Sequence, residues 1–363
     1  MNTYARLYRR LILSSWFAII AGGLFLPAAG PADGAEANPQ GRAASLEAQV
    51  QALVKQVHAL QKQNEAQQAQ IDALKTQNQD FSAKLACISK EGNDLFFTGC
   101  NVNIRNGLGN TGTKNGLGNL IIGYNEDLEG PPNDRSGSHN LVVGIEHTYT
   151  NFGGLVVGFR NTISGNYASV GGGGDNTAAG FSSSVGGGGS NTANGSYAHI
   201  SGGGSNTASG SYASVSGGGS NRAGGYLSSV SGGGFNTAGA DYTAVSGGAY
   251  NTANFDSSSV SGGHNNAASG SYASVSGGGD NVARGMSASV SGGGANKAIG
   301  YLSSISGGSR NTAGEEQATS PGASISGGEN NTASGSYASV SGGINLSAKS
   351  ENCWKAGALK QGC

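Results

Sequence analysis

The chain of 363 residues repeats itself every 15 residues over more than half of its length. From residue 155 onward a branched apolar residue recurs at this spacing, and an Asn follows six residues after each one except the last, Val340. The consensus unit reads S-V-S-G-G-G-S-N-T-A-S-G-S-Y-A. A short, fixed period of this kind is typical of a solenoid, in which each unit packs only on its neighbours. The apolar positions are Val170, Val185, Ile200, Val215, Val230, Val245, Val260, Val275, Val290 and Ile305, and after a five-residue insertion around Glu315 to Pro321 they resume at Ile325 and Val340.

Fifteen residues are too few for a strand–helix unit, but they accommodate two short strands and two turns. Alternation along the strands directs Val170, Asn176 and Ala178 inward and Thr177 outward. The predicted interior is therefore one Val, one Ala and one Asn per coil. Glycine makes up 67 residues, and it permits both close backbone approach and turns with positive φ. The predicted fold is an all-β solenoid, and thirteen coils at about 4.8 Å each would span roughly 60 Å.

The unit S-V-S-G-G…N-T-A-S-G-S-Y-A-S-V resembles the head repeats of trimeric autotransporter adhesins, the YadA-like head, over about residues 100 to 345. The resemblance implies a left-handed parallel β-roll, an adhesive function and a trimer. Three features depart from that family. The period here is 15 residues, and glycine replaces the family's second inward aliphatic residue, as at Gly172 and Gly217. In addition, the helical segment precedes the head, and we expect no C-terminal membrane anchor.

Residues 46 to 86 carry a heptad pattern without Pro or Gly. Such a pattern predicts a coiled coil, here a rod of roughly 60 Å. Val and Ile at one core position and Leu at the other favour two strands, whereas the family resemblance implies three. The alternative is a single amphipathic helix packed on its own domain. The two core registers are Leu46, Leu53, Leu60, Gln67, Leu74 and Phe81, and Val50, Val57, Asn64, Ile71, Asn78 and Leu85.

The N-terminus predicts an export signal. Arg6, Arg9 and Arg10 precede an apolar run from Leu11 to Leu26, and small residues near Ala35 offer a cleavage site. A run of 16 residues is short for a membrane span, which needs about 20. The alternative is an uncleaved N-terminal anchor. We therefore expect an exported protein, extracellular or at the cell surface of a bacterium.

The four cysteines lie in two close pairs, Cys87 with Cys100 and Cys353 with Cys363. Four cysteines allow three connectivities, and their positions favour the two local ones. In an exported protein they are expected to form disulfides at the two ends of the repeat region. The alternative is free buried thiols. No CxxC pair or His cluster accompanies them, so we expect no metal site.

The repeats place several rows of side chains on the surface. Ser residues flank most of the Val positions, Thr residues follow the second strand, and an aromatic residue comes shortly before most of the Val positions. The aromatic row either binds sugars or a partner protein, or covers a turn or an intersubunit seam. The Ser and Thr rows either order water or simply keep the surface soluble. The residues that we single out as a binding surface are Tyr197, Tyr212, Tyr226, Tyr272, Tyr301, Tyr337, Ser214, Ser216, Ser274 and Ser276.

Catalysis is not expected from this sequence, nor is a cofactor. The five histidines share no phase of the repeat, and the glycine strings lack the strand–helix context of a nucleotide-binding loop. A net charge of −1 indicates no nucleic-acid partner.

The expected organisation follows the chain in six parts. A signal or anchor (1–37) and a linker (38–45) precede the coiled coil (46–86), an irregular cap with the first degenerate coils (87–154), the β-roll (155–345) and a C-terminal cap (346–363). The predicted function is multivalent attachment of a homo-oligomer to extracellular matrix, glycan or cell surfaces. The alternatives are an ice-binding, water-ordering solenoid and a purely structural spacer.

Overall fold

The computed structural model describes residues 39–128, 130, 132–315 and 321–363. The described residues form two units, 39–101 and 102–363. The predicted signal segment and most of the predicted insertion after Glu315 lie outside the described residues. In the described part of the chain, no helix has both the length and the hydropathy of a membrane span.

The first unit contains one helix, α2 (Pro39–Lys84). It begins at Pro39, so most of the segment predicted as a linker is helical. The fixed φ of proline suits the first helical position. None of its residues is buried, and the side chains of the heptad core are exposed, for example Leu53 at 61%. No other part of the described chain covers the apolar stripe of this single helix. The structure therefore does not establish the coiled coil.

A small antiparallel hairpin follows α2 in the same unit. Strand β1 (Ile88–Glu91) pairs with β2 (Asp94–Phe97), and Gly92 lies in the turn with a φ of 57°. A disulfide joins Cys87 to Cys100 across the base of the hairpin, with the two Cα atoms 6.0 Å apart. The hairpin is therefore tied to the end of the helix.

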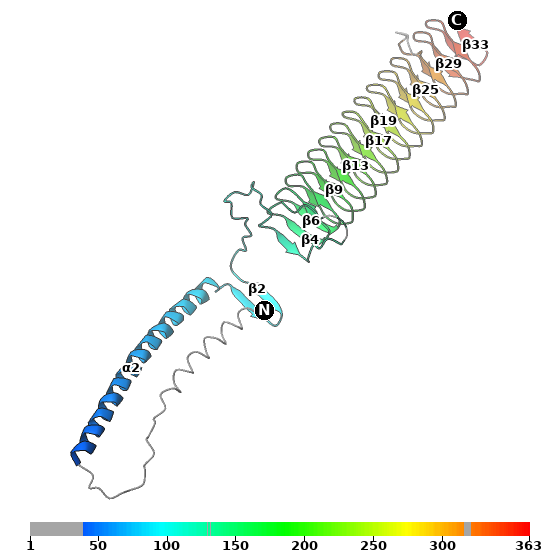
Figure 1. Ribbon diagram of the computed structural model, residues 1–363. Coiled ribbons are helices and arrows are strands. Elements are labelled where there is room, and N and C mark those ends of the chain that lie inside the picture. Colours follow the sequence, from blue (N-terminus) through cyan, green and yellow to red (C-terminus); the bar gives the residue numbers. More distant parts are fainter. Residues whose placement is uncertain (1–38, 129, 131, 316–320) are drawn as a thin grey trace. The chain divides into compact units, whose positions relative to one another are not determined.

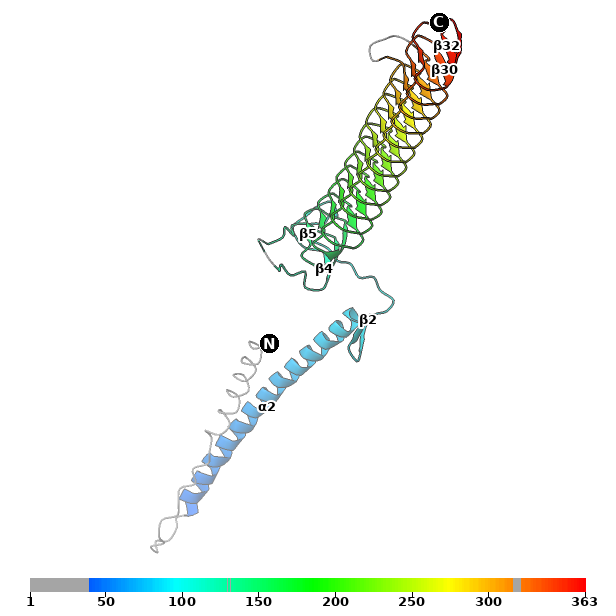
Figure 2. The ribbon, with the colours of Figure 1, turned by 90° about the vertical axis from the view of Figure 1, so that its right-hand side faces the viewer.

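The second unit is a solenoid of short parallel strands, which confirms the predicted all-β solenoid (Figures 1 and 2). Its coils place alternate strands in two facing sheets. The first sheet consists of β3 (Leu120–Ile122), β4 (Leu141–Ile145), β6 (Leu155–Phe159), β8 (Ser169–Val170), β10 (Ser184–Val185), β12 (His199–Ile200), β14 (Ser214–Val215), β16 (Ser229–Val230), β18 (Ala244–Val245), β20 (Ser259–Val260), β22 (Ser274–Val275), β24 (Ser289–Val290), β26 (Ser304–Ile305), β28 (Ser324–Ile325), β30 (Ser339–Gly342), β32 (Trp354–Ala356) and β33 (Leu359–Gln361).

The second sheet has 14 strands. They are β5 (Thr148–Tyr149), β7 (Thr162–Ile163), β9 (Thr177–Ala178), β11 (Thr192–Ala193), β13 (Thr207–Ala208), β15 (Arg222–Ala223), β17 (Thr237–Ala238), β19 (Thr252–Ala253), β21 (Ala267–Ala268), β23 (Val282–Ala283), β25 (Lys297–Ala298), β27 (Thr312–Ala313), β29 (Thr332–Ala333) and β31 (Ser347–Ala348).

Each strand pairs with the strand one repeat away, so equivalent residues lie directly above one another. Val215 is opposite Val230, and Ala208 is opposite Ala223. The register continues past the insertion, because Ile305 pairs with Ile325. The second sheet extends to Ala348, slightly beyond the predicted end of the repeats.

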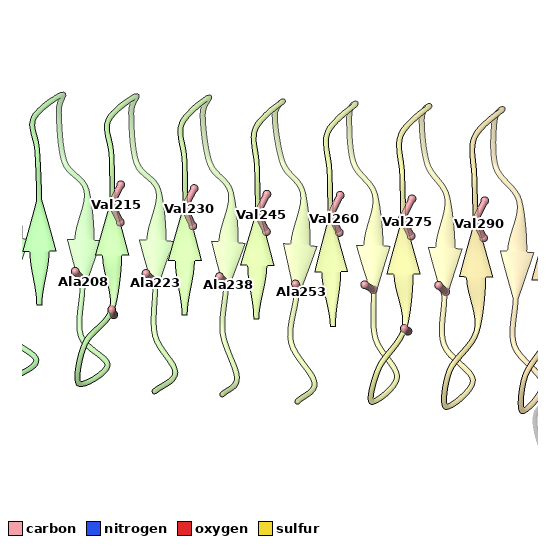
Figure 3. Close-up of a cluster of buried hydrophobic side chains, with 14 of the residues drawn as sticks. Ala208, Val215, Ala223, Val230, Ala238, Val245, Ala253, Val260, Val275 and Val290 are labelled. Atoms are coloured by element: carbon pink, nitrogen blue, oxygen red, sulfur yellow. The ribbon is translucent and has the colours of Figure 1, made fainter. Parts of the chain in front are cut away.

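The interior is a narrow layer between the two sheets, with the Val row on one side and the Ala row on the other (Figure 3). Val215, Ala208 and Asn206 are all fully buried, as the alternation predicted. Thr207 is partly exposed on the outer side.

A fourth buried row, which the sequence analysis missed, lies two residues before each Val. Strand alternation places it on the same side as the Val, so the signal was present in the pattern A-S-V. The row consists of Ala168, Ser183, Ala198, Ala213, Ser228, Thr243, Ser258, Ala273, Ala288, Ser303, Ala323 and Ala338.

Replacing Ser303 with Ala in this fourth row is expected to stabilise the solenoid by about 1 kcal/mol. Its hydroxyl is buried and has no hydrogen-bond partner among the described residues, whereas alanine occupies the same place in other coils. Ser228→Ala is the matched control, because the Ser228 hydroxyl donates to the Gly225 carbonyl at 2.8 Å. Urea unfolding of both variants checks the prediction, and an equal or larger gain for Ser228→Ala would contradict it.

The buried Asn row forms a continuous hydrogen-bonded ladder through the solenoid. In the central coil, the amide of Asn236 donates through Nδ2 to the carbonyls of Gly232 and Gly248, at 2.8 and 2.9 Å. Its Oδ1 accepts the backbone N–H of Asn251 at 3.0 Å. Each Asn thus connects its own turn to the following coil, which satisfies buried backbone groups that the strands leave unpaired.

Three residues per coil have a left-handed backbone, at the turns. In one coil these are Tyr212, Gly218 and Ser220, with φ values of 58°, 83° and 54°. Non-glycine residues therefore occupy two of the three positions. A Cβ on Gly218 would collide with the backbone of Gly233, whereas a Cβ on Gly217 would meet no atom within 4 Å. Glycine is therefore sterically required at Gly218, whereas Gly172 and Gly217 both have space for a side chain.

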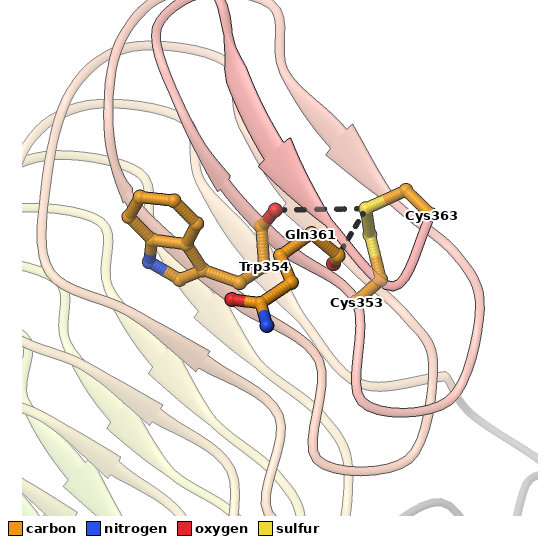
Figure 4. Close-up of a disulfide and its surroundings, with 4 residues drawn as sticks. All are labelled: Cys353, Trp354, Gln361 and Cys363. Carbon is orange, nitrogen blue, oxygen red and sulfur yellow. Dashed lines mark hydrogen bonds between the residues drawn. A yellow bond between two sulfur atoms is a disulfide. The ribbon is translucent and has the colours of Figure 1, made fainter.

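The C-terminal end of the solenoid closes with a hairpin and a disulfide (Figure 4). Strand β33 runs antiparallel to β32, and Cys353 is joined to Cys363 with the Cα atoms 4.9 Å apart. Cys363 Sγ lies 3.6 Å from the carbonyl oxygen of Trp354. The Trp354 indole donates to the Ser341 hydroxyl at 2.8 Å, which attaches the hairpin to the preceding coil.

His147 takes the place of an Asn at the N-terminal end of the ladder. It is fully buried, and its Nδ1 accepts the backbone N–H of Asn161 at 3.2 Å. Its Nε2 lies 3.0 Å from the carbonyl oxygen of Val143, which assigns the proton of the neutral ring to Nε2. Burial lowers the pKa of His147 below its ordinary value, and the charge of Arg135 lowers it further.

The first coils are therefore expected to lose stability as the pH falls from 7.5 to 5. Because the folded-state pKa is lowered, the unfolded chain binds a proton first, and the stability present above about pH 6.5 is lost below it. Hydrogen exchange of the amides around Asn161 at the two pH values measures the loss. His147→Asn restores the side chain used by the other coils. It should abolish the part of the stability loss that is due to protonation of His147. An unchanged pH dependence in that variant would contradict the assignment.

Candidate binding surface

The Ser rows lie on the outer face of the first sheet. Ser214 and Ser274 precede the Val of their coils and are partly exposed, and Ser216 and Ser276 follow the Val and are exposed. The Ser214 position stacks directly on that of Ser229 in the next coil. The structure therefore places all four predicted Ser residues on one face, in two parallel rows.

The Ser rows are interrupted in four coils, and in the row that follows the Val residues Gly171 and Gly186 stand in place of Ser. His199 replaces a serine, with Nδ1 2.7 Å from Ser184 Oγ and Nε2 3.0 Å from Ser201 Oγ. Ala244 interrupts the same row. On the second sheet, the Thr row is broken in register by Arg222, Ala267, Val282 and Lys297. Neither face is an unbroken array of hydroxyl groups.

The aromatic row forms a continuous ladder along one edge of the solenoid, at the turn that leads from the second sheet to the first. Neighbouring ring centroids are 4.8 to 5.8 Å apart. From Tyr167 onward the side chains are 40 to 57% exposed, Tyr226 being the least and Tyr242 the most exposed, and Phe152 is partly buried. We call this set the aromatic ladder: Phe152, Tyr167, Phe181, Tyr197, Tyr212, Tyr226 and Tyr242.

The orientation of each ring depends on its place in the turn. Tyr197 and Tyr212 both lie three residues before the Val of their coils, and their rings stack with an interplanar angle of 11°. Tyr226 lies four residues before its Val, and it meets Tyr212 at 86° and Tyr242 at 84°. The ladder therefore presents rings in two orientations, because its residues come from two adjacent backbone positions.

The other predicted tyrosines do not belong to the ladder. No ring contact involves Tyr272, Tyr301 or Tyr337 within the described residues, although all three are exposed. The ladder ends after Tyr242 because the next coil has Asp256 and Ser257 at the two positions that carry the rings, and its Phe255 lies one residue earlier. The structure thus brings together three of the six predicted tyrosines, Tyr197, Tyr212 and Tyr226.

A second, shorter aromatic group occupies the other turn and was missed by the sequence analysis. Phe235 stacks on Tyr250 with centroids 4.9 Å apart, and Tyr250 meets the ring of His264 at 5.5 Å. Phe235 and Tyr250 stand directly before the repeated Asn, a position that Ser fills in several other coils, and His264 lies two residues before it. The group covers three coils only.

Other features offer little chemistry. A surface hollow near the first coils is lined by residues that include Arg105, Asn110 and His139. The His139 ring is engaged with backbone groups, accepting the N–H of Asn106 at Nε2 over 3.3 Å. In the part of the chain that the structure describes, no group of His, Cys, Asp and Glu side chains is arranged to hold a metal ion.

No protein-family model matches the chain, and no curated protein shows significant similarity to it.

Proposed function

We propose that this protein is a non-catalytic attachment protein, which binds extracellular matrix, glycans or cell surfaces through many equivalent contacts along its solenoid. The observation that carries the proposal is the exact vertical repetition of exposed groups, such as Ser214 above Ser229, on a rigid stack of coils. A solenoid with one surface unit per coil suits multivalent binding, because weak contacts multiply along its length.

The proposal includes a homo-oligomer that forms through α2, a trimer or a dimer. It is supported by the heptad residues, all of which are exposed on the isolated helix. Leu46, Leu60 and Leu74 are each 60% exposed or more, and such a stripe is costly to leave in water. The strand β3 is a second exposed apolar segment that supports self-association. Its residues Leu120, Ile121 and Ile122 are all more than 40% exposed.

The proposal also places the protein outside the cell, at the surface of a bacterium. It is supported by the basic residues and apolar run of the N-terminal sequence and by the two local disulfides. We further propose that the coils wind left-handed, as in the YadA-like head that the repeat resembles.

Shortening the solenoid tests the proposed function. Deleting residues 246–305 joins Val245 to Ser306 and removes 60 residues, which is four coils of 15 and preserves the register. On a panel of surfaces coated with matrix proteins and glycans, we expect binding to the matrix proteins to fall about tenfold, with the oligomeric state unchanged. Lack of binding by the full chain to every surface would exclude attachment and leave the spacer and ice-binding alternatives. A solution mass equal to one chain would overturn the oligomer.

One observation favours a second function, ordering of water at an ice surface. The Ser rows on the first sheet are in register over many coils. Thermal hysteresis and shaping of ice crystals by the full chain test this alternative. Absence of both at micromolar protein concentration would exclude it.

A further inference from the structure

The aromatic ladder has the geometry of a binding site for a linear polymer. Its rings are held by the rigid coil stack at successive heights, and each is in edge or face contact with the next. Between Phe152 and Tyr242 no coil lacks a ring. This continuity distinguishes the ladder from Tyr272, Tyr301 and Tyr337, which stand apart.

The turns that carry the ladder are uncharged. They hold Gly, Ala, Ser and Asn beside the rings, and from Phe152 to Leu227 they contain no Asp, Glu, Lys or Arg. Asp241 enters only at the last coil, where its carboxylate accepts the Tyr226 backbone N–H at 2.8 Å. Near the ends of the ladder two cations lie close to the rings. Lys114 Nζ contacts the carbonyl oxygen of Thr150 at 2.9 Å, two residues before Phe152, and the Arg222 side chain lies beside Gly224, two residues before Tyr226. The turns from Tyr167 to Tyr212 carry no cation of their own, so they give no attraction for a polyanion.

The exposed groups of the ladder are of two chemical kinds, apolar ring faces and hydroxyl groups. Tyrosine supplies five of the seven rings, and each combines an apolar face with a phenol hydroxyl. The neighbouring turn residues add the hydroxyls of Ser182, Ser196 and Ser211. A sugar ring is matched to such a surface, because it carries C–H groups on its faces and hydroxyl groups on its rim.

The spacing of the rings also matches the spacing of sugars in an extended polysaccharide. Successive ring centroids are 4.8 to 5.8 Å apart, and their coils repeat at the spacing of adjacent strands, about 4.8 Å. An extended β-linked polysaccharide advances by a similar distance for each sugar. We propose that the aromatic ladder binds an extended, neutral polysaccharide laid along this edge of the solenoid, one sugar per coil. This inference rests on the proposed attachment function and names the class of surface recognised.

The test is co-sedimentation of the full chain with insoluble cellulose and chitin, with polygalacturonate as an anionic probe. We expect retention on at least one of the two neutral polymers and none on the anionic one. The variant Tyr197→Ala, Tyr212→Ala, Tyr226→Ala should lose at least tenfold in affinity. The matched control is Phe235→Ala, Tyr250→Ala, which removes two equally exposed stacked rings from the other turn and should stay within twofold of the unchanged chain.

A measurement on the unmutated protein covers the case in which the triple variant fails to fold. Nitration of tyrosine by tetranitromethane, located by mass spectrometry, should be suppressed at Tyr197, Tyr212 and Tyr226 when the polysaccharide is present. Tyr250 should react equally with and without it. Equal reactivity at all four sites would overturn the proposal.

The outcomes also separate this inference from the proposed function. The deletion of residues 246–305 leaves the ladder intact, so retention on the neutral polymer should persist in that variant. Binding of the full chain to collagen-coated beads but to neither polysaccharide would overturn the ladder proposal and leave the attachment function in place. Retention of the triple variant at the level of the unchanged chain would also overturn it.

Discussion

Replacing Gly218 with alanine is expected to destabilise the solenoid by more than about 3 kcal/mol. Gly218 has a φ of 83°, and a Cβ there would collide with the carbonyl oxygen of Gly233 in the next coil and crowd the Asn221 amide. The new methyl group therefore has to separate two coils that their backbone hydrogen bonds hold together. Because each coil packs only on its neighbours, the damage should centre on the coils next to the substitution.

Gly217→Ala is the control for this prediction, one residue away. A Cβ at Gly217 meets no atom within 4 Å, and its φ lies outside the left-handed range. We expect a change within about 0.5 kcal/mol. Urea unfolding and hydrogen exchange of the amides of residues 200–235 measure both variants. Similar losses in the two would show that the coils are not stacked as closely as the structure describes.

Replacing Asn236 with alanine is expected to cost about 3–5 kcal/mol. The side chain is fully buried and takes part in three hydrogen bonds, donating to the carbonyls of Gly232 and Gly248 and accepting the N–H of Asn251. Its removal leaves these backbone groups buried without partners, in a layer too narrow to admit other side chains. The loss therefore exceeds that of a single surface hydrogen bond.

Thr237→Ala is the neighbouring control, since Thr237 lies on the outer side of the same coil. It should change stability by no more than about 0.5 kcal/mol. The readout is the unfolding midpoint in urea, together with the exchange rate of the Asn251 amide, which should rise only in the Asn236 variant. Equal midpoints for the two variants would argue against a buried ladder.

Much of the solenoid was predictable from the repeat. When each coil stacks on a copy of itself, equivalent residues of all coils face the same way, inward or outward. The spacing of Val215 and Val230 defined the period, and strand alternation placed Asn206 and Ala208 inside. The same rule implied the buried row of Ala213, but the glycine-rich turn obscured how much of the coil was strand. For α2, the heptads predicted the helix, and a single chain contains no partner to cover them.

The candidate surface was predictable in part. The recurrence of tyrosine indicated an aromatic row, yet the sequence does not distinguish Tyr212, which lies in the ladder, from Tyr272, which stands alone. Contact depends on whether the adjacent coil also places a ring at the same edge. At the two ring-bearing positions, the turn before Tyr272 has Asp256 and Ser257, with Phe255 one residue earlier, and the turn after it has Met286 and Ser287.

The sequence by itself determined the period, the inward rows and the parallel register, since these follow from alternation and from stacking of identical units. Only the tertiary structure decided what happens in the turns. There the backbone takes left-handed conformations at Tyr212 and Ser220, and alternation no longer gives the direction of a side chain. The joining of seven rings into one ladder and the open space at Gly217 both depend on those turns. Both features arise from the path that the backbone takes between strands, and a residue pattern does not specify this path.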